Sequence, residues 1–248
     1  MLLGNVSYML NLGTNYQTSL ASYIRINEIQ NLKCEINGII KLDNIDKISI
    51  EHLYFKYDEL SIFNDFNYLF LKNKIYCVMG RNGSGKSTLI DIITGLNYDY
   101  TGVVKYNDID IKEINMYYLR FNSISIVEQE PILFTDSFYN NITFNNNCDI
   151  NMVEKIKHQF KLDYFDLSNK IEENSINLSG GEKQKVCLIR SILKDSNILI
   201  LDEPTSALDN ESILILKNLL VSIKRNKIIL IITHDKELAE IADEIINI

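Results

Sequence analysis

The sequence predicts an α/β domain built on a mostly parallel sheet, and three observations lead to this prediction. Short apolar runs alternate with stretches of helical periodicity from Lys47 onward, which is the order that gives parallel strands joined by helices. A glycine-rich loop at residues 80–88 stands between one such run and a helix. A second apolar run, residues 198–201, ends in two adjacent carboxylates, Asp202 and Glu203.

The N-terminal segment, from Met1 to about Asn44, is expected to form a helix and a linker. Apolar residues recur in it at approximately helical spacing, at positions 8, 9 and 12, then 20, 23 and 24, then 29 and 32. Two interpretations stay open. The helix either packs on the domain with its apolar face or needs a partner that is absent from this chain.

From Lys47 the pattern changes to strands and helices in alternation. The expected strands cover residues 48–57, with an irregularity in mid-run, then 75–79, 123–127, 198–201 and 228–232. The expected helices cover residues 87–95, which end on a glycine, then 152–160, 182–193 and 211–223. No internal repeat of solenoid period interrupts this order.

Composition and charge exclude several classes of protein. The net charge of -8 over 248 residues argues against a nucleic-acid binder, which would carry a broad basic face. No apolar run approaches the ~20 residues that cross a bilayer, so the chain is expected to be soluble by itself. The cysteines are far apart and form no metal-binding pair, so they are expected to be small buried hydrophobes in a reducing cytosol: Cys34, Cys77, Cys148 and Cys187.

The glycine-rich loop is a complete phosphate-binding loop, placed between a strand and a helix as its chemistry requires. Glycines let backbone N–H groups turn inward around phosphates, and the helix N-terminus adds partial positive charge. Lys86 would reach the β- and γ-phosphates, and the Ser87 hydroxyl would ligate Mg²⁺. The loop reads Gly80-Arg81-Asn82-Gly83-Ser84-Gly85-Lys86-Ser87-Thr88 and is called the phosphate loop below.

The two carboxylates that follow residues 198–201 complement the phosphate loop. A strand would carry Asp202 to the edge of the sheet, where it can hold Mg²⁺, usually through water. Glu203, one residue later, can act as general base for the attacking water. By itself such a pair could also be a helix-capping feature.

A third segment, residues 178–182, reads Leu178-Ser179-Gly180-Gly181-Glu182 and is called the signature segment below. A serine and two glycines before a helix make another anion-binding helix N-terminus, although alone they would be interpreted as an N-cap with a flexible turn. Together with the phosphate loop and the acidic strand end, the signature segment resembles the ABC ATPase superfamily.

The resemblance extends from about Ile48 to Ile248 and implies a fold, a substrate and a cofactor. The fold is that of a P-loop NTPase of the ABC type: a mostly parallel core sheet, an antiparallel β subdomain and a small α-helical subdomain at about residues 130–180. The ATPase domain would cover residues 46–248, after a helical linker at 1–45. ATP and Mg²⁺ are the ligands that this family uses.

The resemblance also assigns roles by position in the motif order. Tyr57 matches the aromatic residue that stacks on adenine, and Gln129 matches the glutamine that touches Mg²⁺, the water and the membrane subunit. Asp209 ends the loop that crosses the dimer interface, and His234 matches the switch histidine at the γ-phosphate. His52 and His158 match no motif.

The predicted site therefore contains three overlapping sets of residues. The catalytic set is Glu203, His234, Lys86 and Gln129, and the metal set is Ser87, Gln129 and Asp202. The nucleotide-binding set is Tyr57, Asn82, Gly83, Ser84, Gly85, Lys86, Ser87, Thr88, Ser179, Gly180, Gly181 and Asp209.

Several details resemble an exporter. Residues 129–134 and 137–142 are similar to the exporter segment after the glutamine, and residues 25–29 are similar to the join between the last transmembrane helix and the ATPase domain. Residues 1–45 would then resemble the cytoplasmic end of that helix. This interpretation implies transmembrane domains of an ABC exporter as partners and places the domain at the cytoplasmic face of the cell membrane.

Three features depart from the family pattern. The signature segment ends in Glu182, where glutamine is commoner. Residues 170–177 lack most of the loop by which many exporters sense their membrane subunit, and Glu173 is the equivalent residue. Both ends of the chain resemble cuts in a longer transporter.

The leading hypothesis is ATP hydrolysis coupled to export, by a homodimer that encloses ATP as a sandwich. A non-transport ABC ATPase of chromosome maintenance would need a long coiled coil before the signature segment, and no sustained heptads occur there. A regulatory, degenerate ABC module would have lost Glu203, His234 or the signature segment. The Asn-rich composition resembles ATPase domains of Gram-positive peptide and bacteriocin exporters.

Overall fold

Internal contacts divide the chain into two units, Met1–Ile36 and Asn37–Ile248. The computed structural model describes residues 2–32, 35, 37–144, 148–172 and 177–248. The first unit contains the helix α1 (Leu2–Gln30), which confirms a helix in the N-terminal segment. None of the helices in the described ranges has the length and apolar character needed to span a membrane.

The second unit is organised around a five-stranded parallel sheet with strand order β6-β7-β8-β3-β9. The inner strands β7, β8 and β3 are continuous apolar runs because both faces of a parallel sheet are covered. Their carboxyl ends meet at one edge, where ligands of open α/β sheets bind. The bounds are β3 (Lys74–Met79), β6 (Ile124–Val127), β7 (Ile198–Asp202), β8 (Ile228–Ile232) and β9 (Glu244–Asn247).

Alternate residues of these strands point into two different cores. Ile198 and Ile200 pack in a cluster that contains the apolar residues of α2 (Lys86–Ile93). Leu199 and Leu201 pack in a second cluster, with α6 (Gly180–Leu193) and α7 (Asn210–Ile223). This follows from the two-residue period of a strand.

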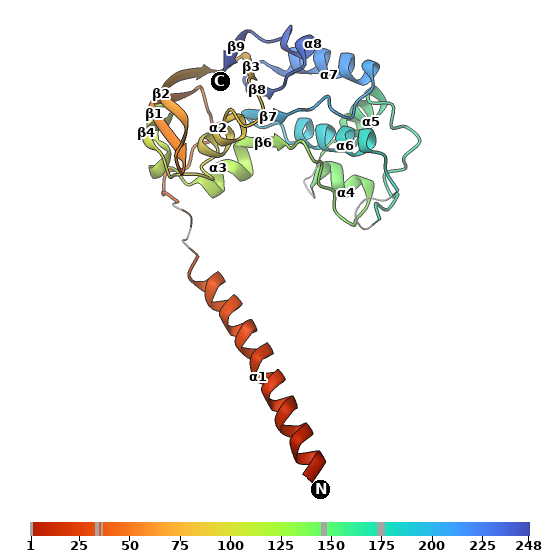
Figure 1. Cartoon of the computed structure of the whole chain (residues 1–248). Coiled ribbons are helices and arrows are strands. Elements are labelled where there is room, and N and C mark those ends of the chain that lie inside the picture. Colours follow the sequence, from red (N-terminus) through yellow and green to blue (C-terminus); the bar gives the residue numbers. More distant parts are fainter. Residues whose placement is uncertain (1, 33–34, 36, 145–147, 173–176) are drawn as a thin grey trace. The chain divides into compact units, whose positions relative to one another are not determined.

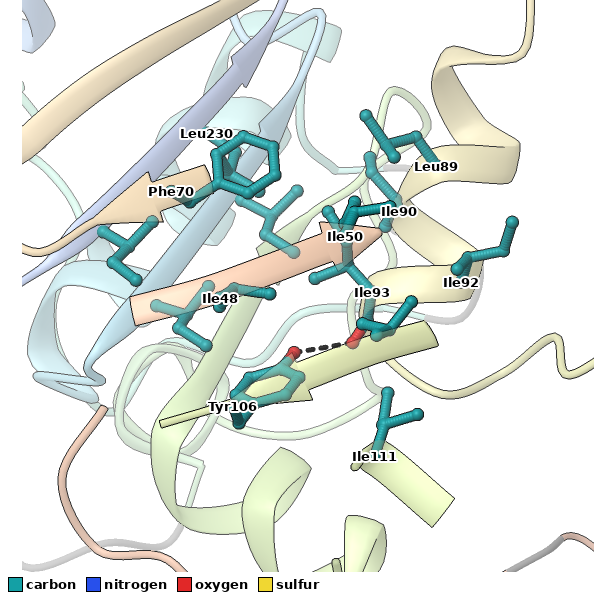
Figure 2. Packing of buried hydrophobic residues seen from close by; sticks show 14 of the residues in the cluster. Ile48, Ile50, Phe70, Leu89, Ile90, Ile92, Ile93, Tyr106, Ile111 and Leu230 are labelled. Carbon is teal, nitrogen blue, oxygen red and sulfur yellow. Dashed lines mark hydrogen bonds between the residues drawn. The ribbon is translucent and has the colours of Figure 1, made fainter. Parts of the chain in front are cut away.

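A four-stranded antiparallel sheet, in the order β2-β1-β4-β5, covers the α2 side. In Figure 2, Ile48 and Ile50 of β1 and Tyr106 of β4 lie beside α2, and the Tyr106 hydroxyl donates a hydrogen bond to the Ile93 carbonyl at 2.5 Å. The helix that follows the phosphate loop is thus held between two sheets. The strands are β1 (Lys47–Tyr57), β2 (Leu60–Leu71), β4 (Thr101–Tyr106) and β5 (Ile109–Asp110).

At the opposite end of this unit, α4 (Phe138–Thr143) and α5 (Ile150–Gln159) pack against α6 (Figure 1). Arg190 joins α6 to α4 and to the segment before it, because it donates to the Asn141 carbonyl at 2.7 Å and to the Ile132 carbonyl at 3.0 Å. The antiparallel sheet, the parallel sheet and this group of helices confirm the predicted fold class.

All the strands and helices predicted from periodicity are present, with ends shifted by a few residues. The predicted irregularity in β1 is a register shift between Ile50 and Leu53, beside His52 with φ 50°. The linker joins the domain before the predicted boundary, since the Gly38 N–H donates to the Ile114 carbonyl at 2.9 Å. The elements that periodicity did not predict are β2, β4, β5, β9, the 3₁₀ helix η1 (Ile111–Glu113), α3 (Met116–Ser123), α4 and α8 (Lys236–Ala239).

The predicted burial of the cysteines is confirmed for Cys77 and Cys187. Cys148 is half-buried, and Cys34 lies outside the described residues. Burial raises the pKa of the Cys77 thiol to about 11, so the group stays a neutral, inert part of the core.

Candidate functional site

A cleft of about 590 Å³ lies at the carboxyl edge of the parallel sheet. It brings together most of the residues that the sequence motifs singled out. The lining residues are Tyr57, Leu60, Ile62, Asn82, Gly83, Gly85, Lys86, Ser87, Thr88, Gln129, Asp202, Glu203, Ser206 and His234. Five separate stretches of the chain thus meet in one place.

The phosphate loop depends on glycine at two positions. Gly83 and Gly85 have φ of 80° and 106°, in the left-handed region that side chains disfavour. A Cβ on Gly85 would also lie 2.2 Å from Cγ2 of Ile62. Only a glycine at this position allows α2 to begin directly at the cleft.

The start of α2 presents unused hydrogen-bond donors to the cleft. Gly85 is the N-cap and supplies no side-chain acceptor, so the first N–H groups of the helix lack intrahelical partners. The Lys86 ammonium donates to the carbonyls of Gly80 at 2.9 Å and Arg81 at 3.0 Å. The Ser84 hydroxyl is buried and has no partner among the described residues. This donor-rich cradle fits a phosphate chain.

Asp202 and Glu203 place two carboxyl groups at the end of β7. Burial raises the pKa of the Asp202 carboxyl, the neighbouring Glu203 raises it further, and Lys86 lowers it. Two adjacent carboxylates repel each other in a partly buried site. A cation bound between these carboxyl groups and a phosphate chain in the cleft would relieve this repulsion.

Glu203 is held in an unusual conformation. Its φ is 44°, which costs conformational energy for a residue with a side chain. Its N–H donates to the Ile232 carbonyl at 2.9 Å, and its carboxylate lies 2.9 Å from Nδ1 of His234 and accepts from the Thr233 hydroxyl at 3.3 Å. These contacts aim the Glu203 carboxylate and the His234 ring at the same cleft.

Tyr57 stands at the end of β1 on the rim of the cleft. Its side chain is half exposed, its ring packs edge-on against Phe55 at 4.8 Å, and its hydroxyl lies 3.5 Å from the Thr88 hydroxyl. An exposed aromatic face held beside the phosphate loop can stack on a planar base.

The oxygen-bearing residues of the cleft fit Mg²⁺. The part of the chain with described coordinates contains no cluster of three or more His, Cys, Asp or Glu side chains that could cage a metal. Mg²⁺, however, needs only one or two protein oxygens when phosphates supply others. Ser87, Gln129 and Asp202 all line the cleft and would hold the ion.

The signature segment and Asp209 do not line this cleft. Ser179 caps α6, where its hydroxyl accepts from the Glu182 N–H and its own N–H donates to the Glu182 carboxylate at 2.7 Å. Asp209 caps α7 by accepting from the Ser212 N–H, and its carboxylate lies 3.3 Å from Nζ of Lys185. One copy of the chain therefore presents the predicted nucleotide-binding residues on two separate surfaces.

Some residues of the site escaped the sequence motifs. Leu60 and Ile62 of β2 line the cleft, and Thr233 contacts Glu203. Thr233 stands beside a recognised motif, whereas no signal marked β2. Ser206 begins the loop 206–209, which the resemblance assigned to the dimer interface, and it also lines the cleft. Glu173 lies outside the described residues. Two histidines without a motif form exposed pairs away from the cleft, namely His52 with Asp65 and His158 with Asp163.

Comparisons with known proteins agree with this geometry. A family model described as ABC transporter matches residues 63–206. The ATP-dependent lipid A-core flippase of Shewanella frigidimarina is 33% identical over 225 residues, 86% of this chain and 37% of that protein. P-glycoprotein 14 of Caenorhabditis elegans is 30% identical over 256 residues, 98% of this chain and 19% of that protein.

A solved structure shows the same fold. The structure of a bacterial Atm1-family ABC exporter with ATP bound superposes with a TM-score of 0.81 at 22% identity, covering 94% of this chain and 43% of the other. The chain thus spans less than half the length of each of these three relatives. With the family match covering more than half of its residues, the chain belongs to the ABC transporter family, of which it carries the ATPase domain.

Proposed function

We propose that this chain binds Mg-ATP and hydrolyses it to power export through membrane domains that a complete transporter would contain. The observation that carries the proposal is the single cleft that joins the phosphate loop, the Asp202–Glu203 pair, Gln129 and His234. Intact catalytic positions weigh against a regulatory, degenerate ABC module.

ATP binding follows from the donors and the rim of the cleft. The N–H groups of residues 83–88 and the start of α2 would surround the β- and γ-phosphates. Lys86 would exchange its two carbonyl acceptors for phosphate oxygens, a charge-assisted contact. Tyr57 would stack on the adenine ring, which explains why an aromatic side chain stands half exposed at this position.

Hydrolysis requires a base beside the γ-phosphate. Glu203 would accept a proton from water as the water oxygen attacks the γ-phosphorus and the bond to the β-phosphate oxygen breaks, releasing ADP and phosphate. His234, 2.9 Å from the Glu203 carboxylate, would orient that base and contact the γ-phosphate. Mg²⁺, held by Ser87, Gln129 and Asp202, would neutralise negative charge on the phosphate oxygens.

The predicted nucleotide-binding residues that lie outside the cleft support a dimer. Ser179, Gly180 and Gly181 lie outside the cleft of their own chain, so they would cover the ATP of a second copy arranged about a C₂ axis. Asp209 would cross near the interface. ATP would supply the negative charge that holds two electropositive helix starts together.

Membrane domains would dock beside Gln129. Two cavities of about 510 and 230 Å³ are lined by residues of β6, of α6 and of the segment around α4. Exposed aromatic residues line them, including Phe121, Phe134 and Phe144. Exposed apolar patches of this kind mark interaction sites.

The N-terminal helix fits the same proposal. Alignments with exporters run over 96–98% of this chain, so they include residues that precede the ATPase domain. Several apolar side chains of α1 are exposed, among them Leu20, Tyr23, Ile24 and Ile29. The helix would continue a membrane domain, and the ATPase domain would work at the cytoplasmic face of the membrane. A peptide cargo stays a prediction from composition.

Nucleotide binding by two variants tests the site. Lys86→Ala should nearly abolish ATP binding because it removes the only cleft lysine among the described lining residues. Tyr57→Ala should weaken binding modestly, since stacking on an aromatic contributes ~1–3 kcal/mol per base in nucleic-acid complexes. Equilibrium titration with a fluorescent ATP analogue measures both, and unchanged affinity in both variants would contradict the assignment.

Turnover by Glu203→Gln tests the chemistry. The amide keeps the size and hydrogen-bonding reach of the side chain but cannot accept the proton, so hydrolysis should fall ~10²–10⁴-fold while ATP still binds. Phosphate release measures the rate. Full turnover by this variant would show that another group activates the water.

A further inference from the structure

The Glu182 carboxylate accepts hydrogen bonds from both donors of Ser179, the serine of the signature segment. Its Oε2 accepts from the Ser179 N–H at 2.7 Å and from the Ser179 hydroxyl at 2.6 Å. Its Oε1 accepts from the hydroxyl of Tyr164, 18 residues earlier in the chain. Both oxygens of one carboxylate are therefore occupied at the start of α6.

Helix capping explains only part of this arrangement. A capping box needs a residue at this position whose side-chain oxygen accepts from the N-cap N–H, and glutamine serves as well as glutamate. It needs no bond to a tyrosine from another segment. The Tyr164 side chain is 64% exposed, yet partial burial of its hydroxyl, and after it the bond to Glu182, raise the pKa of the phenol to about 12.

We propose that Glu182 is a positioning residue that weakens the engagement of a second copy's ATP by the signature segment, and that Tyr164 restrains it. This inference rests on the proposed sandwich dimer. In that dimer the Ser179 hydroxyl must turn from the Glu182 carboxylate to a γ-phosphate oxygen. The carboxylate competes for the same hydroxyl and repels the incoming triphosphate.

The balance of charge supports this competition. A helix N-terminus favours one anion, and in this chain a carboxylate already occupies it. A second anion would enter within a few ångströms of the first, where like charges disfavour each other. The Tyr164 hydrogen bond holds Oε1 and offsets part of the charge, so the carboxylate repels the phosphate less than a free one would.

The central experiment compares ATP-driven association in two backgrounds. The first protein carries Glu203→Gln, which leaves bound ATP unhydrolysed. The second carries Glu203→Gln together with Glu182→Gln. Sedimentation with Mg-ATP should give a dimer about tenfold tighter for the double variant, because the neutral amide still caps α6 but no longer repels ATP. The gain should shrink between about 0.05 M and about 0.5 M salt, since screening removes only an electrostatic effect.

Matched variants separate charge at this site from other causes. Glu113→Gln removes the same charge from η1, outside the cleft and the signature segment, and should leave association unchanged. ATP affinity of the monomer should be equal with and without Glu182→Gln, because Glu182 does not line the cleft. A salt-independent gain, or an equal gain from Glu113→Gln, would overturn the inference.

Tyr164→Phe tests the restraint. It should weaken ATP-driven association several-fold when Glu182 is present and change it little in the Glu182→Gln background, so the two effects should not add. Tyr117→Phe, at an exposed tyrosine of α3, is the control for loss of a hydroxyl. Equal effects of Tyr164→Phe in both backgrounds would refute the role of Tyr164.

The outcomes distinguish this inference from the proposed function. Glu203→Gln dimers of equal affinity with and without Glu182→Gln would overturn the inference alone. If Glu203→Gln binds Mg-ATP but no variant associates, both the inference and the sandwich dimer fail.

Discussion

At the scale of single residues, Glu203 combines a strained backbone conformation with several hydrogen-bond partners. Glu203 adopts a left-handed φ of 44° directly after a buried strand. The conformation is maintained by the bond from its N–H to Ile232 and by the contacts of its carboxylate with Thr233 and His234. Because Ile232 ends β8 and the other two partners follow it directly, a small shift between β7 and β8 would move the Glu203 carboxylate relative to the phosphate loop.

His234 is the partner whose removal we expect to lower turnover more than ATP binding. His234→Ala should lower the rate of ATP hydrolysis about 10²-fold, as does loss of one donor aimed at a developing charge. ATP affinity should change much less, because the phosphate loop and Tyr57 remain. Single-turnover hydrolysis and equilibrium titration measure the two quantities. His52→Ala, at an exposed histidine outside the cleft, is the control, and an equal loss of affinity and rate would contradict this role.

At the scale of elements, the start of α6 packs against the segment that leads into α7. A Cβ on Gly181 would lie 2.8 Å from the Ala207 carbonyl oxygen, so a glycine is needed for this close approach. Gln184 is fully buried and donates to the Pro204 carbonyl at 3.4 Å, and Lys185 pairs with Asp209. The signature segment and the loop after Glu203 are thus one packed assembly.

The cap of α7 predicts a pH dependence of stability. The Ser212 N–H, and to a lesser degree Lys185, lower the pKa of the Asp209 carboxyl to about 2. A depressed folded-state pKa stabilises the protein above the unfolded value, near 3.8, and this contribution is lost as pH falls toward about 2. Since the Asp209 side chain is 62% exposed, the ion pair contributes little and the cap dominates.

Asp209→Ala should therefore lower the free energy of unfolding by about 1 kcal/mol at neutral pH. The difference from the unmodified chain should narrow below about pH 4, because the protonated aspartate loses its advantage. Urea unfolding at several pH values measures it. Asp209→Asn keeps an acceptor oxygen without the charge, so its smaller loss would isolate the hydrogen bond. A difference that is constant between pH 6 and pH 3 would refute this account.

At the scale of the whole molecule, the predicted nucleotide-binding residues are divided between two surfaces. This division predicts that two copies of the chain associate only when ATP is bound. Without nucleotide, facing helix starts and lysines should repel, so the chain should be mainly monomeric. Mg-ATP should convert this repulsion into attraction. Sedimentation of Glu203→Gln with and without Mg-ATP should show a monomer and a dimer, respectively.

Ser179→Arg supplies the complementary test of the sandwich. The bulky side chain would block the surface that covers the second nucleotide, so hydrolysis should fall while ATP still binds to the cleft of each chain. Circular dichroism checks that α6 persists after loss of its cap. A Glu203→Gln variant that binds ATP but stays monomeric at high concentration, or a Ser179→Arg variant with unchanged turnover, would exclude the sandwich mechanism.

Local patterns in the sequence were sufficient to predict much of the fold and of the candidate site. The apolar runs predicted the strands β3, β6, β7 and β8, because parallel strands buried on both faces leave continuous apolar sequence. The phosphate loop, the Asp202–Glu203 pair and the signature segment were readable because each performs its chemistry over adjacent residues. By themselves these motifs indicated the ABC ATPase fold and ATP as the ligand. The strands β2, β4, β5 and β9 and the short helices were missed, since half-buried segments carry weaker periodicity.

Contacts between distant parts of the chain were decided only by the tertiary structure. Tyr57 ends β1 beside Thr88 of α2. Glu203 meets His234 because the two residues follow the neighbouring parallel strands β7 and β8. The same packing excludes Ser179 from its own cleft and brings Tyr164 to Glu182. Sequence periodicity reports which face of an element is buried, whereas the partner on that face depends on how all the elements pack together.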